Sequence, residues 1–429
     1  MKLSEANYNE IRKKFTGLDL EEFDIISTPI SDISKFRGST KSINLGSVVS
    51  NYHQIRSITQ KNVIAVVKAR AYGAGLLAIS NKLYEEGCRA YAVATLGAGI
   101  ALQQGLPEDN SLILILGFIP AEALELALTD NLSVSITDFD VWPYYKKELE
   151  KLNNNKSFKP VNFHINVDTG MTRVGVPASL NNITKVKELA KDIQASPLAN
   201  LQGIYTHFPL AGQLRSSGSY AENLTLEQIA TVAKIVEHLK QLQIKPPYIH
   251  VANSPAVEQY PEAYNSWLTH VRTGSLLHGI SLRNDKKFKR VIKWTTSLAR
   301  VEKLERDIGV GYGHSYQGFK EQYIGTLTVG YADGYLNASG TFKNWVRIEG
   351  IMVPVVGSVA MDMCMIDLGP YVAAKGKAPE PYDALSIELM SDGTTNDILS
   401  MESLGRRWGV SWATVLAGIR TRNVSVYTQ

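Results

Sequence analysis

The sequence predicts an α/β + β protein: an N-terminal (β/α)8 barrel of the TIM type, followed by a C-terminal domain that is mostly β. Eight short apolar runs alternate with helix-compatible segments between residues 62 and 279, which is the number and order of elements in such a barrel. From about residue 290 onward, β-rich runs follow one another, separated by Gly, Pro and Asp turns with few helical signals. The chain of 429 residues is long enough for both parts.

The eight apolar runs are the predicted barrel strands. They read as continuous apolar segments, as expected for parallel strands that are buried on both faces. They cover residues 62–69, 90–95, 111–117, 132–138, 161–168, 201–208, 248–253 and 270–279. Helix-compatible stretches between them include residues 75–87, 120–130 and 221–242. A doubly wound parallel sheet shows the same alternation and is the competing interpretation.

The second part is predicted from β-rich runs of a different arrangement. They cover residues 295–305, 321–331, 345–359, 363–369 and 384–392. We therefore predict three segments along the chain: a leader at residues 1–40 without an assigned purpose, the barrel at residues 41–288, and the C-terminal β domain at residues 289–429.

The composition is typical of a globular protein that binds neither nucleic acid nor a membrane. Hydrophobic residues make up 44% of the chain, and 45 Lys and Arg against 41 Asp and Glu leave a net charge of +4 without a dense basic block. Residues 1–15 are polar, and the most apolar stretch, residues 111–128, is interrupted by proline and glutamate, so we predict a cytoplasmic protein. Cys88 and Cys364 are too few for a disulfide framework or a zinc site, and we expect buried thiols and no metal.

Polar side chains follow the predicted barrel strands at their carboxyl ends, where barrel enzymes place their catalytic groups. These positions are Lys68 after the first strand, Arg173 after the fifth, His207 after the sixth, Asn253 and Ser254 after the seventh, and residues 272–275 within the eighth. Because the carboxyl ends of barrel strands meet at one mouth, we expect these residues to converge there.

Lys68 and the two last loops point to one cofactor. A lysine at the tip of a buried strand loses hydration, which lowers its pKa and makes a neutral amine available for Schiff-base chemistry. The plainer alternative is a lysine whose amine reaches solvent. Ser254 and the amides of Gly274 and Ser275 form a plausible phosphate cradle, although each loop taken singly could be an ordinary one. An amine facing a phosphate cradle favours pyridoxal 5'-phosphate.

Several motifs resemble those of the alanine racemase family. The stretch AVVKARAYGAG at residues 65–75 resembles that family's pyridoxal-lysine motif, usually AVVKANAYGHG. The likeness covers about residues 41–429, in the family's order. It continues through VDTGMTRVG (167–175), THF (206–208), ANS (252–254), VRTG (271–274), VGYG (310–313), VGYADGY (329–335) and VAMDMCMIDLG (359–369).

The resemblance implies a fold-type III pyridoxal enzyme that works as a head-to-tail homodimer. By this likeness Lys68 would bind the cofactor aldehyde, Arg272 would face the pyridine nitrogen, and Arg173 would bond the phenolic oxygen and lie near the substrate carboxylate. The other cofactor and substrate positions implied are Tyr72, Ser254, Gly274 and Ser275 at the phosphate, Asn253 beside them, His207 beside Arg272, the Met361 amide at the substrate, and Asn166 and Asp362 in support.

Racemisation requires one base on each face of the substrate's α-carbon. Lys68 would take the proton from D-alanine, and Tyr312, reaching the site from the other subunit, would take it from L-alanine. Arg272, acting through His207, would lower the tyrosine pKa from its usual value near 10. Since a guanidinium keeps its proton, Arg272 would also leave the cofactor ring a weaker electron sink. Each of these residues read alone could equally be structural.

Some positions depart from the family pattern and bear on the substrate. Asn166 stands where many relatives carry a carbamylated lysine that supports Arg173, His278 stands where a tyrosine is usual, and Ala413 aligns with a phosphate-binding tyrosine. We predict an isomerase that interconverts L- and D-alanine and supplies D-alanine for the cell wall. The alternative is a broad-specificity racemase for serine or larger, basic amino acids. A decarboxylase, a non-catalytic pyridoxal carrier and an amino-acid-sensing regulator fit the motifs less well.

Overall fold

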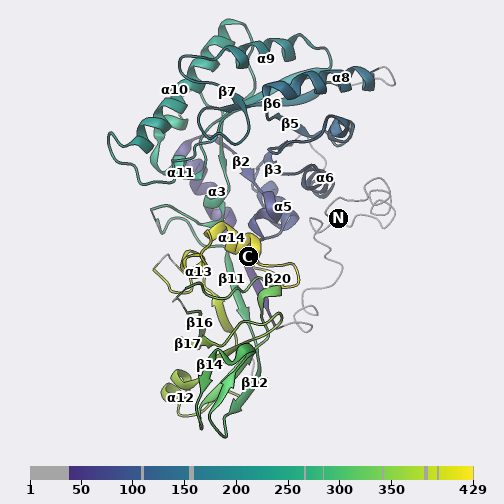
Figure 1. Ribbon diagram of the computed structural model, residues 1–429. Helices are drawn as coiled ribbons and strands as arrows, with labels where there is room; N and C mark the ends of the chain where they lie inside the picture. Colours follow the sequence, from purple (N-terminus) through teal and green to yellow (C-terminus); the bar gives the residue numbers. More distant parts are fainter. Residues whose placement is uncertain are drawn as a thin grey trace. The chain divides into compact units, whose positions relative to one another are not determined.

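The computed structural model describes residues 38–107, 111–153, 159–264, 267–283, 285–340, 343–380, 385–393 and 396–428. The predicted leader therefore lies outside the described residues up to residue 37. The described chain divides into two compact units (Figure 1). The first contains residues 48–71 and 76–289, and the second contains residues 38–47, 72–75 and 290–428.

The first unit is a nearly closed parallel barrel, which confirms the predicted fold class. Its strands are β2 (Asn62–Val66), β3 (Ala90–Val93), β4 (Leu112–Ile115), β5 (Ser133–Ile136), β6 (Val161–Asp168), β8 (Ala199–Tyr205), β9 (Tyr248–His250) and β10 (His270–Thr273). The last strand pairs with the first, and Arg272 N donates to Ala252 O at 2.8 Å beside β9. This closure excludes the doubly wound sheet. A short strand, β7 (Val176–Pro177), pairs with the end of β6.

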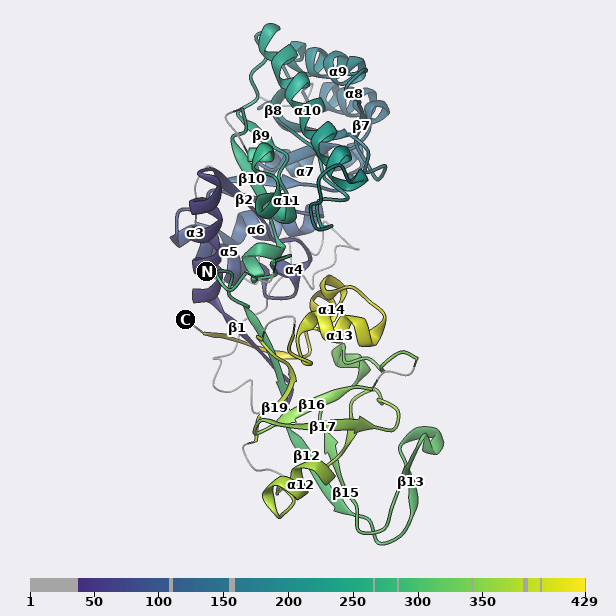
Figure 2. The ribbon, with the colours of Figure 1, turned by 90° about the vertical axis from the view of Figure 1, so that its left-hand side faces the viewer.

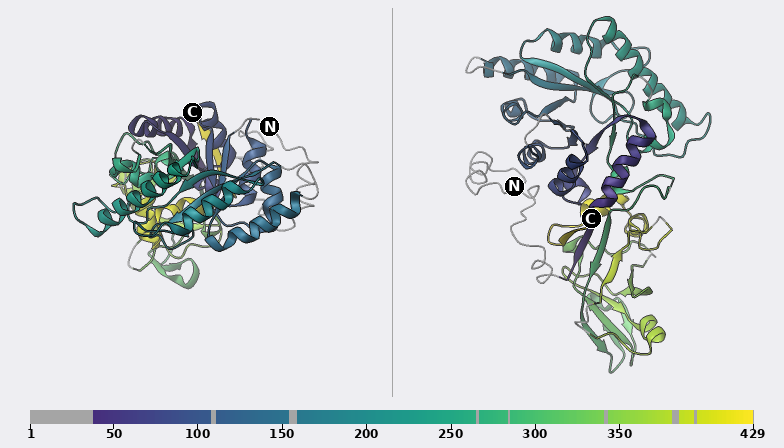
Figure 3. Two further views of the ribbon diagram at one scale, coloured as in Figure 1. Left: turned by 90° about the horizontal axis from the view of Figure 1, so that it is seen from above. Right: turned by 180° about the vertical axis from the view of Figure 1, so that it is seen from behind.

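Helices follow the barrel strands and lie on their outer side, as Figures 1 and 3 show for α8, α9 and α10. Helix α3 (Leu45–Thr59) precedes β2. The helices after the strands are α5 (Leu76–Glu85), α6 (Leu96–Gly105), α7 (Leu124–Thr129), α8 (Trp142–Asn153), α9 (Thr184–Ala195), α10 (Tyr220–Gln241) and α11 (Ser254–Gln259). Ser219 caps the N-terminus of helix α10, because its hydroxyl accepts from Glu222 N. It buries Val232, Ile235 and Leu239, which recur at helical spacing.

The strands bury apolar residues such as Ile64, Phe163 and Ile204, as a packed barrel requires. The interior also contains polar side chains, at positions where barrels of this kind usually have Val, Ile or Leu. His164 and His250 are fully buried, and Arg272 is 4% exposed. Buried polar groups are costly unless each has a hydrogen-bond partner, so their contacts are of functional interest.

The second unit is built on a nine-stranded sheet in the order β12-β15-β18-β17-β16-β19-β11-β1-β20. Its strands are β1 (Thr40–Asn44), β11 (Ile292–Thr296), β12 (Leu298–Lys303), β15 (Tyr323–Leu327), β16 (Trp345–Ile348), β17 (Ile351–Val356), β18 (Cys364–Asp367), β19 (Ile387–Met390) and β20 (Val424–Thr428). A separate hairpin of β13 (Ile308–Val310) and β14 (Tyr316–Gly318) projects from it (Figure 2).

Two features of the second unit differ from the sequence prediction. Strand β1 spans the predicted boundary between leader and barrel, with residues 41–44 predicted in the barrel, and it pairs antiparallel with β11 and parallel with β20. The unit also contains three helices among its described residues, α12 (Gly369–Lys375), α13 (Met401–Trp408) and α14 (Trp412–Gly418). Ser400 and Ser411 cap the N-termini of helices α13 and α14. Their hydroxyls accept from the backbone N of Ser403 and of Thr414.

Two further properties bear on the expected class of protein. No helix in the described ranges is long and apolar enough to cross a bilayer. No group of three or more His, Cys, Asp and Glu in those ranges is placed to hold a metal ion. Cys88 and Cys364 are both buried free thiols, which confirms the prediction made for them.

Candidate active site

The chain turns sharply after β2, and this turn displays Lys68. Val67 N donates to Ala92 O at 2.9 Å, which completes the strand, and Ala71 N donates to Val67 O at 2.8 Å. Between these bonds, Ala69, Arg70 and Ala71 have φ of 50°, 56° and 51°, in the left-handed region. Residues with a side chain pay about 1–2 kcal/mol each in that region, so the surrounding structure must impose the turn. Such a concentration of strain is typical of a functional site.

The Lys68 amine lies in a cationic environment. Burial lowers its pKa, and Arg173 and then Arg272 lower it further by charge repulsion. Among the described residues, no carboxylate contributes to this shift. An amine with a lowered pKa, close enough to two guanidinium groups to be repelled by them, fits a ligand that carries both a carbonyl group and negative charge.

The residues after the turn belong to the second unit and are tightly held there. The rings of Tyr72 and Trp412 stack with centroids 6.2 Å apart, and Lys41 Nζ donates to Gly73 O at 2.5 Å. Gly73 has φ of 81°, and a Cβ there would lie 2.5 Å from Leu416 O, so only glycine fits. Sequence reasoning considered Ala413 and missed Trp412, the aromatic residue directly before it.

Arg272 on β10 is held by four hydrogen bonds. Its Nη1 donates to His250 Nδ1 at 2.8 Å and to His250 O at 3.0 Å. Its Nη2 donates to Thr206 O at 2.7 Å and to His207 Nδ1 at 3.1 Å. The structure thus brings Arg272 and His207 together, and it fixes the guanidinium before any ligand binds.

His207 is a neutral donor in this arrangement. Burial, Arg272, Arg173 and Lys68 together lower its pKa to about 3. Because a guanidinium can only donate, His207 Nδ1 must accept, and the ring proton lies on Nε2. His207 therefore offers one N–H group to a partner on its other side.

The loops after β9 and β10 meet at Ser254. Its oxygen accepts from Gly274 N at 3.1 Å and from Leu276 N at 3.4 Å, which leaves the hydroxyl proton available to a ligand. Asn253 caps α11 through Ala256 N, and its Nδ2 donates to Phe208 O at 3.0 Å. Its side chain thus joins two loops at the barrel mouth. Ser275 begins a short 3-10 turn, Ser275–His278, directly after Gly274.

The loop after β6 carries Arg173 to its exposed position. Asp168 Oδ1 accepts from the backbone N of Gly170, Met171 and Thr172 at 3.0, 2.9 and 3.0 Å, which shapes the loop. The Asn166 amide donates to Val174 O at 3.1 Å. The contact of Asn166 is therefore with the backbone one residue beyond Arg173, whereas the sequence had suggested support for the Arg173 side chain.

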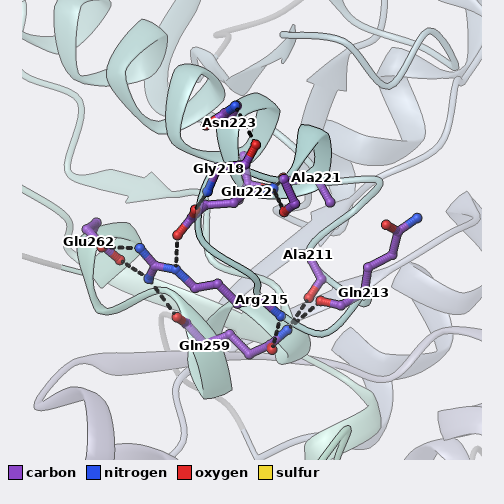
Figure 4. A network of polar contacts seen from close by, with 11 residues as sticks. Ala211, Gln213, Arg215, Gly218, Ala221, Glu222, Asn223, Gln259 and Glu262 are labelled. Atoms are coloured by element: carbon purple, nitrogen blue, oxygen red, sulfur yellow. Dashed lines mark hydrogen bonds and ion pairs between the residues drawn. The ribbon is translucent and has the colours of Figure 1, made fainter.

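The loop after His207 is anchored by Arg215 (Figure 4). The guanidinium donates to Glu262 through Nη1 and Nη2 at 3.0 and 2.9 Å, and its Nε donates to Glu222 Oε1 at 2.6 Å. Gln259 accepts from Arg215 N at 2.9 Å and donates to two backbone carbonyls of the same loop. These contacts tie the loop to α10 and α11. Sequence reasoning did not single out this network, because its members lie far apart in the chain.

Tyr312 lies at the tip of the β13–β14 hairpin and is 77% exposed. Gly311 and Gly313 flank it with φ of 73° and 66°, and a Cβ at Gly311 would lie 2.6 Å from Met365 Cε. The two glycines therefore allow the turn that presents the phenol to solvent. Met361 is 53% exposed in the same unit.

The remaining predicted residues have structural partners or are buried. The Asp362 carboxylate bonds Arg422, whose Nε also contacts Asp333 Oδ1 at 2.9 Å. His278 is buried, and burial lowers its pKa to about 4. It is therefore a neutral side chain within the first unit.

Four buried or partly buried histidines predict a stability that falls with acid. Burial holds the pKa of His164 and His207 at about 3 and that of His270 and His278 at about 4. Unfolded histidine titrates near 6.5, so below about pH 6.5 the unfolded chain binds protons that the folded chain rejects. We expect the free energy of unfolding to fall between about pH 6.5 and 4, by up to about 1.4 kcal/mol per pH unit for each histidine.

Urea unfolding of the holoenzyme at about pH 7 and pH 5 measures this slope. His278→Asn should reduce the slope, because it removes one of the buried rings. Equal stability at the two pH values would show that these rings are not held neutral.

The comparisons with known proteins agree with this geometry. Residues 43–282 match the family described as "Alanine racemase, N-terminal domain", and residues 291–427 match "Alanine racemase, C-terminal domain". An alanine racemase of Clostridium novyi is 33% identical over 333 residues, which cover 76% of this chain and 80% of that protein. One of Geobacillus kaustophilus is 29% identical over 378 residues, with coverage of 86% and 88%.

Solved structures show the same fold. The alanine racemase of Clostridium difficile 630 has a TM-score of 0.78 at 24% identity and covers 91% of this chain and 96% of its own. That of Bartonella henselae, described with covalently bound pyridoxal phosphate, has a TM-score of 0.74 at 23% identity, with coverage of 91% and 99%. With both parts of the chain matched and a relative above 30% identity over most of its length, this protein belongs to the alanine racemase family.

Proposed function

We propose that this protein is a pyridoxal-phosphate-dependent alanine racemase that interconverts L- and D-alanine, in the cytoplasm, and supplies D-alanine for the cell wall. The observation that carries the proposal is Lys68, a partly buried amine that a strained turn displays and whose pKa is lowered by burial and by the charges of Arg173 and Arg272. The two free thiols fit a reducing compartment.

The residues at the barrel mouth fit pyridoxal phosphate. The cationic group of Lys68, Arg173 and Arg272 suits an anionic ligand, and the Lys68 amine would hold its aldehyde carbon. The Ser254 hydroxyl, with Gly274, Ser275 and Tyr72, would hold the phosphate, and Asn253 would keep their loops together. When bound, the cofactor supplies an electron-withdrawing ring that acidifies the α-hydrogen of the attached amino acid.

Arg272 would meet the pyridine nitrogen of this ring. A guanidinium does not give up its proton, so Arg272 would leave that nitrogen unprotonated and limit how far charge moves into the ring. This favours return of the proton to the α-carbon and therefore racemisation.

The chain's own bases would then move the proton. The Lys68 amine, in its deprotonated form, would take it from the α-carbon of D-alanine on one face, and the Tyr312 phenolate would take it from L-alanine on the other. Each would return a proton in the opposite direction. The Nε2–H of neutral His207, fixed by Arg272, would donate to the tyrosine oxygen and stabilise its deprotonated form.

The exposure of Tyr312 supports a homodimer in which each subunit completes the site of the other. Tyr312, Met361 and Phe319 of the second unit are 77%, 53% and 58% exposed in the single chain, and aromatic residues and Met are enriched at subunit interfaces. A second copy of this chain would cover them and bring Tyr312 and the Met361 amide to its own barrel mouth.

A chiral assay of the purified protein tests the proposed function. We expect racemisation of L-alanine by the holoenzyme and turnover at least about tenfold lower on serine, lysine and arginine, since the relatives are named for alanine. Trp412, which stacks on Tyr72, would supply an aromatic ring next to Ala413, the position that aligns with a phosphate-binding tyrosine in the family. Comparable turnover on the larger amino acids would instead support the broad-specificity alternative, and no racemisation of any of them would contradict the proposal.

A further inference from the structure

A chain of hydrogen bonds runs through the barrel interior from the candidate site toward the opposite end of the strands. Arg272 Nη1 donates to His250 Nδ1 at 2.8 Å, and His250 Nε2 lies 3.2 Å from His164 Nδ1. His164 Nε2 lies 3.0 Å from Gln202 Oε1, which also accepts from Ser133 Oγ at 2.6 Å. We call these five residues the interior chain.

The direction of every bond in the interior chain follows from Arg272. A guanidinium only donates, so His250 Nδ1 accepts and the ring carries its proton on Nε2. That proton points to His164 Nδ1, so His164 also carries its proton on Nε2. The last donor then needs an acceptor, which the carbonyl oxygen of Gln202 supplies.

The direction holds only while both histidines are neutral. Burial lowers the pKa of His164 to about 3 and that of His250 well below its usual value. Arg272 and His270 face both rings and oppose a further positive charge. Tyr248 and Tyr205 complete the surroundings: the Tyr248 ring lies 5.7 Å from that of His164, and the Tyr205 ring stacks on that of His250 at 4.9 Å.

We propose that Gln202 is a positioning residue for the racemase site: its neutral amide fixes the proton positions of His164 and His250, and thereby presents a lone pair to Arg272. This inference rests on the proposed function, because Arg272 is the residue that would meet the cofactor ring. Gln202 itself lies in the middle of β8, away from the strand end that leads to His207.

A carboxylate at this position would make the arrangement depend on pH. While its neighbour His164 is neutral, Gln202→Glu accepts from Nε2 as the amide does. A carboxylate also stabilises an imidazolium, and a protonated His164 donates from Nδ1 as well. His250 would then have to accept that bond at Nε2 and carry its own proton on Nδ1. The Nδ1–H of His250 would face an N–H group of Arg272, and two donors cannot form a hydrogen bond. Arg272 would lose an acceptor and shift.

The test compares Gln202→Glu with Asn200→Asp, both as holoenzymes. Asn200 is exposed on the same strand and its amide contacts Asn162, so this control adds the same charge outside the interior chain. We expect kcat for Gln202→Glu to be about tenfold below the control at about pH 5.5, and about equal to it near pH 8.5. A merely structural role would lower kcat by the same factor at every pH. A flat ratio of the two variants would overturn the proposal.

A second measurement observes the wild-type protein directly and does not depend on activity. Nitrogen-15 spectra of histidine-labelled wild-type holoenzyme report which ring nitrogen carries the proton. We expect the Nε2–H form for His164 and His250 and no titration above about pH 5, with the signals assigned by single histidine replacements. An Nδ1–H form, or an imidazolium at neutral pH, would overturn the proposal. A wild-type protein that does not racemise alanine would instead overturn the proposed function, while these spectra still decide the role of Gln202.

Discussion

Lys68→Arg is expected to lower kcat for both L- and D-alanine by about 10³-fold or more, because it removes the covalent anchor of the cofactor and one of the two bases. Arginine is a long side chain like lysine, but its guanidinium keeps its proton, so the variant lacks an amine that could act as a base or bond the aldehyde. The arginine guanidinium cannot become neutral near physiological pH. In contrast, burial and two guanidinium groups lower the pKa of Lys68 and so favour its neutral amine. A chiral assay in both directions measures the loss.

Absorbance provides an independent measurement on the same variant. The wild-type holoenzyme should be yellow through the bond between Lys68 and the cofactor aldehyde, and Lys68→Arg should lose that band. Lys82→Arg is the matched control, since Lys82 pairs with Glu85 on the surface of α5. A Lys68→Arg enzyme that keeps more than about a tenth of wild-type kcat would show that another residue performs these roles.

Tyr312→Phe is expected to lower kcat by about 10²- to 10⁴-fold, because it removes only the phenol that would act on L-alanine. Lys68 remains, so D-alanine should still exchange its α-hydrogen in deuterated water without being converted to L-alanine. Mass spectrometry and the chiral assay, run on the same sample, separate exchange from racemisation. This combination of results is specific to a two-base mechanism.

The control for this variant is Tyr220→Phe, which changes a tyrosine of similar exposure, 76% against 77%. It should leave kcat unchanged. Loss of exchange and racemisation together in Tyr312→Phe would mean that the tyrosine maintains the site as a whole. Full activity would mean that Tyr312 is not a base.

Much of the fold was accessible from the sequence because parallel barrel strands are continuous apolar runs. The predicted strand at residues 161–168 coincides with β6, while β10 ends at Thr273 because the chain turns at Gly274. Strand β1 was missed because it is short and its buried positions include Lys41, so its partners β11 and β20 decide its place. Helices α13 and α14 were missed because eight and seven residues are fewer than the window over which helical periodicity is read.

The residues of the candidate site likewise divide into those that the sequence predicts and those that only the fold reveals. Residues that follow strand ends, such as Lys68 and Ser254, could be proposed from their position along the chain. The left-handed turn after Lys68 could not, since Ala69 and Arg70 have no preference for that conformation. The interior chain was also not visible, because His164 and Gln202 become neighbours only when β6 and β8 pair. Local signals reveal strand ends, whereas partners across the barrel require the fold.

The most direct test of a site shared by two subunits mixes the two inactive variants. Lys68→Arg and Tyr312→Phe chains are unfolded together in equal amounts, refolded with pyridoxal phosphate and assayed for racemisation. In a mixed dimer, the barrel with intact Lys68 would receive the intact tyrosine of its partner. Random pairing should therefore restore about a quarter of wild-type activity. If the mixture stays as inactive as either variant alone while equal refolding of wild type recovers activity, the two bases do not meet across a subunit boundary.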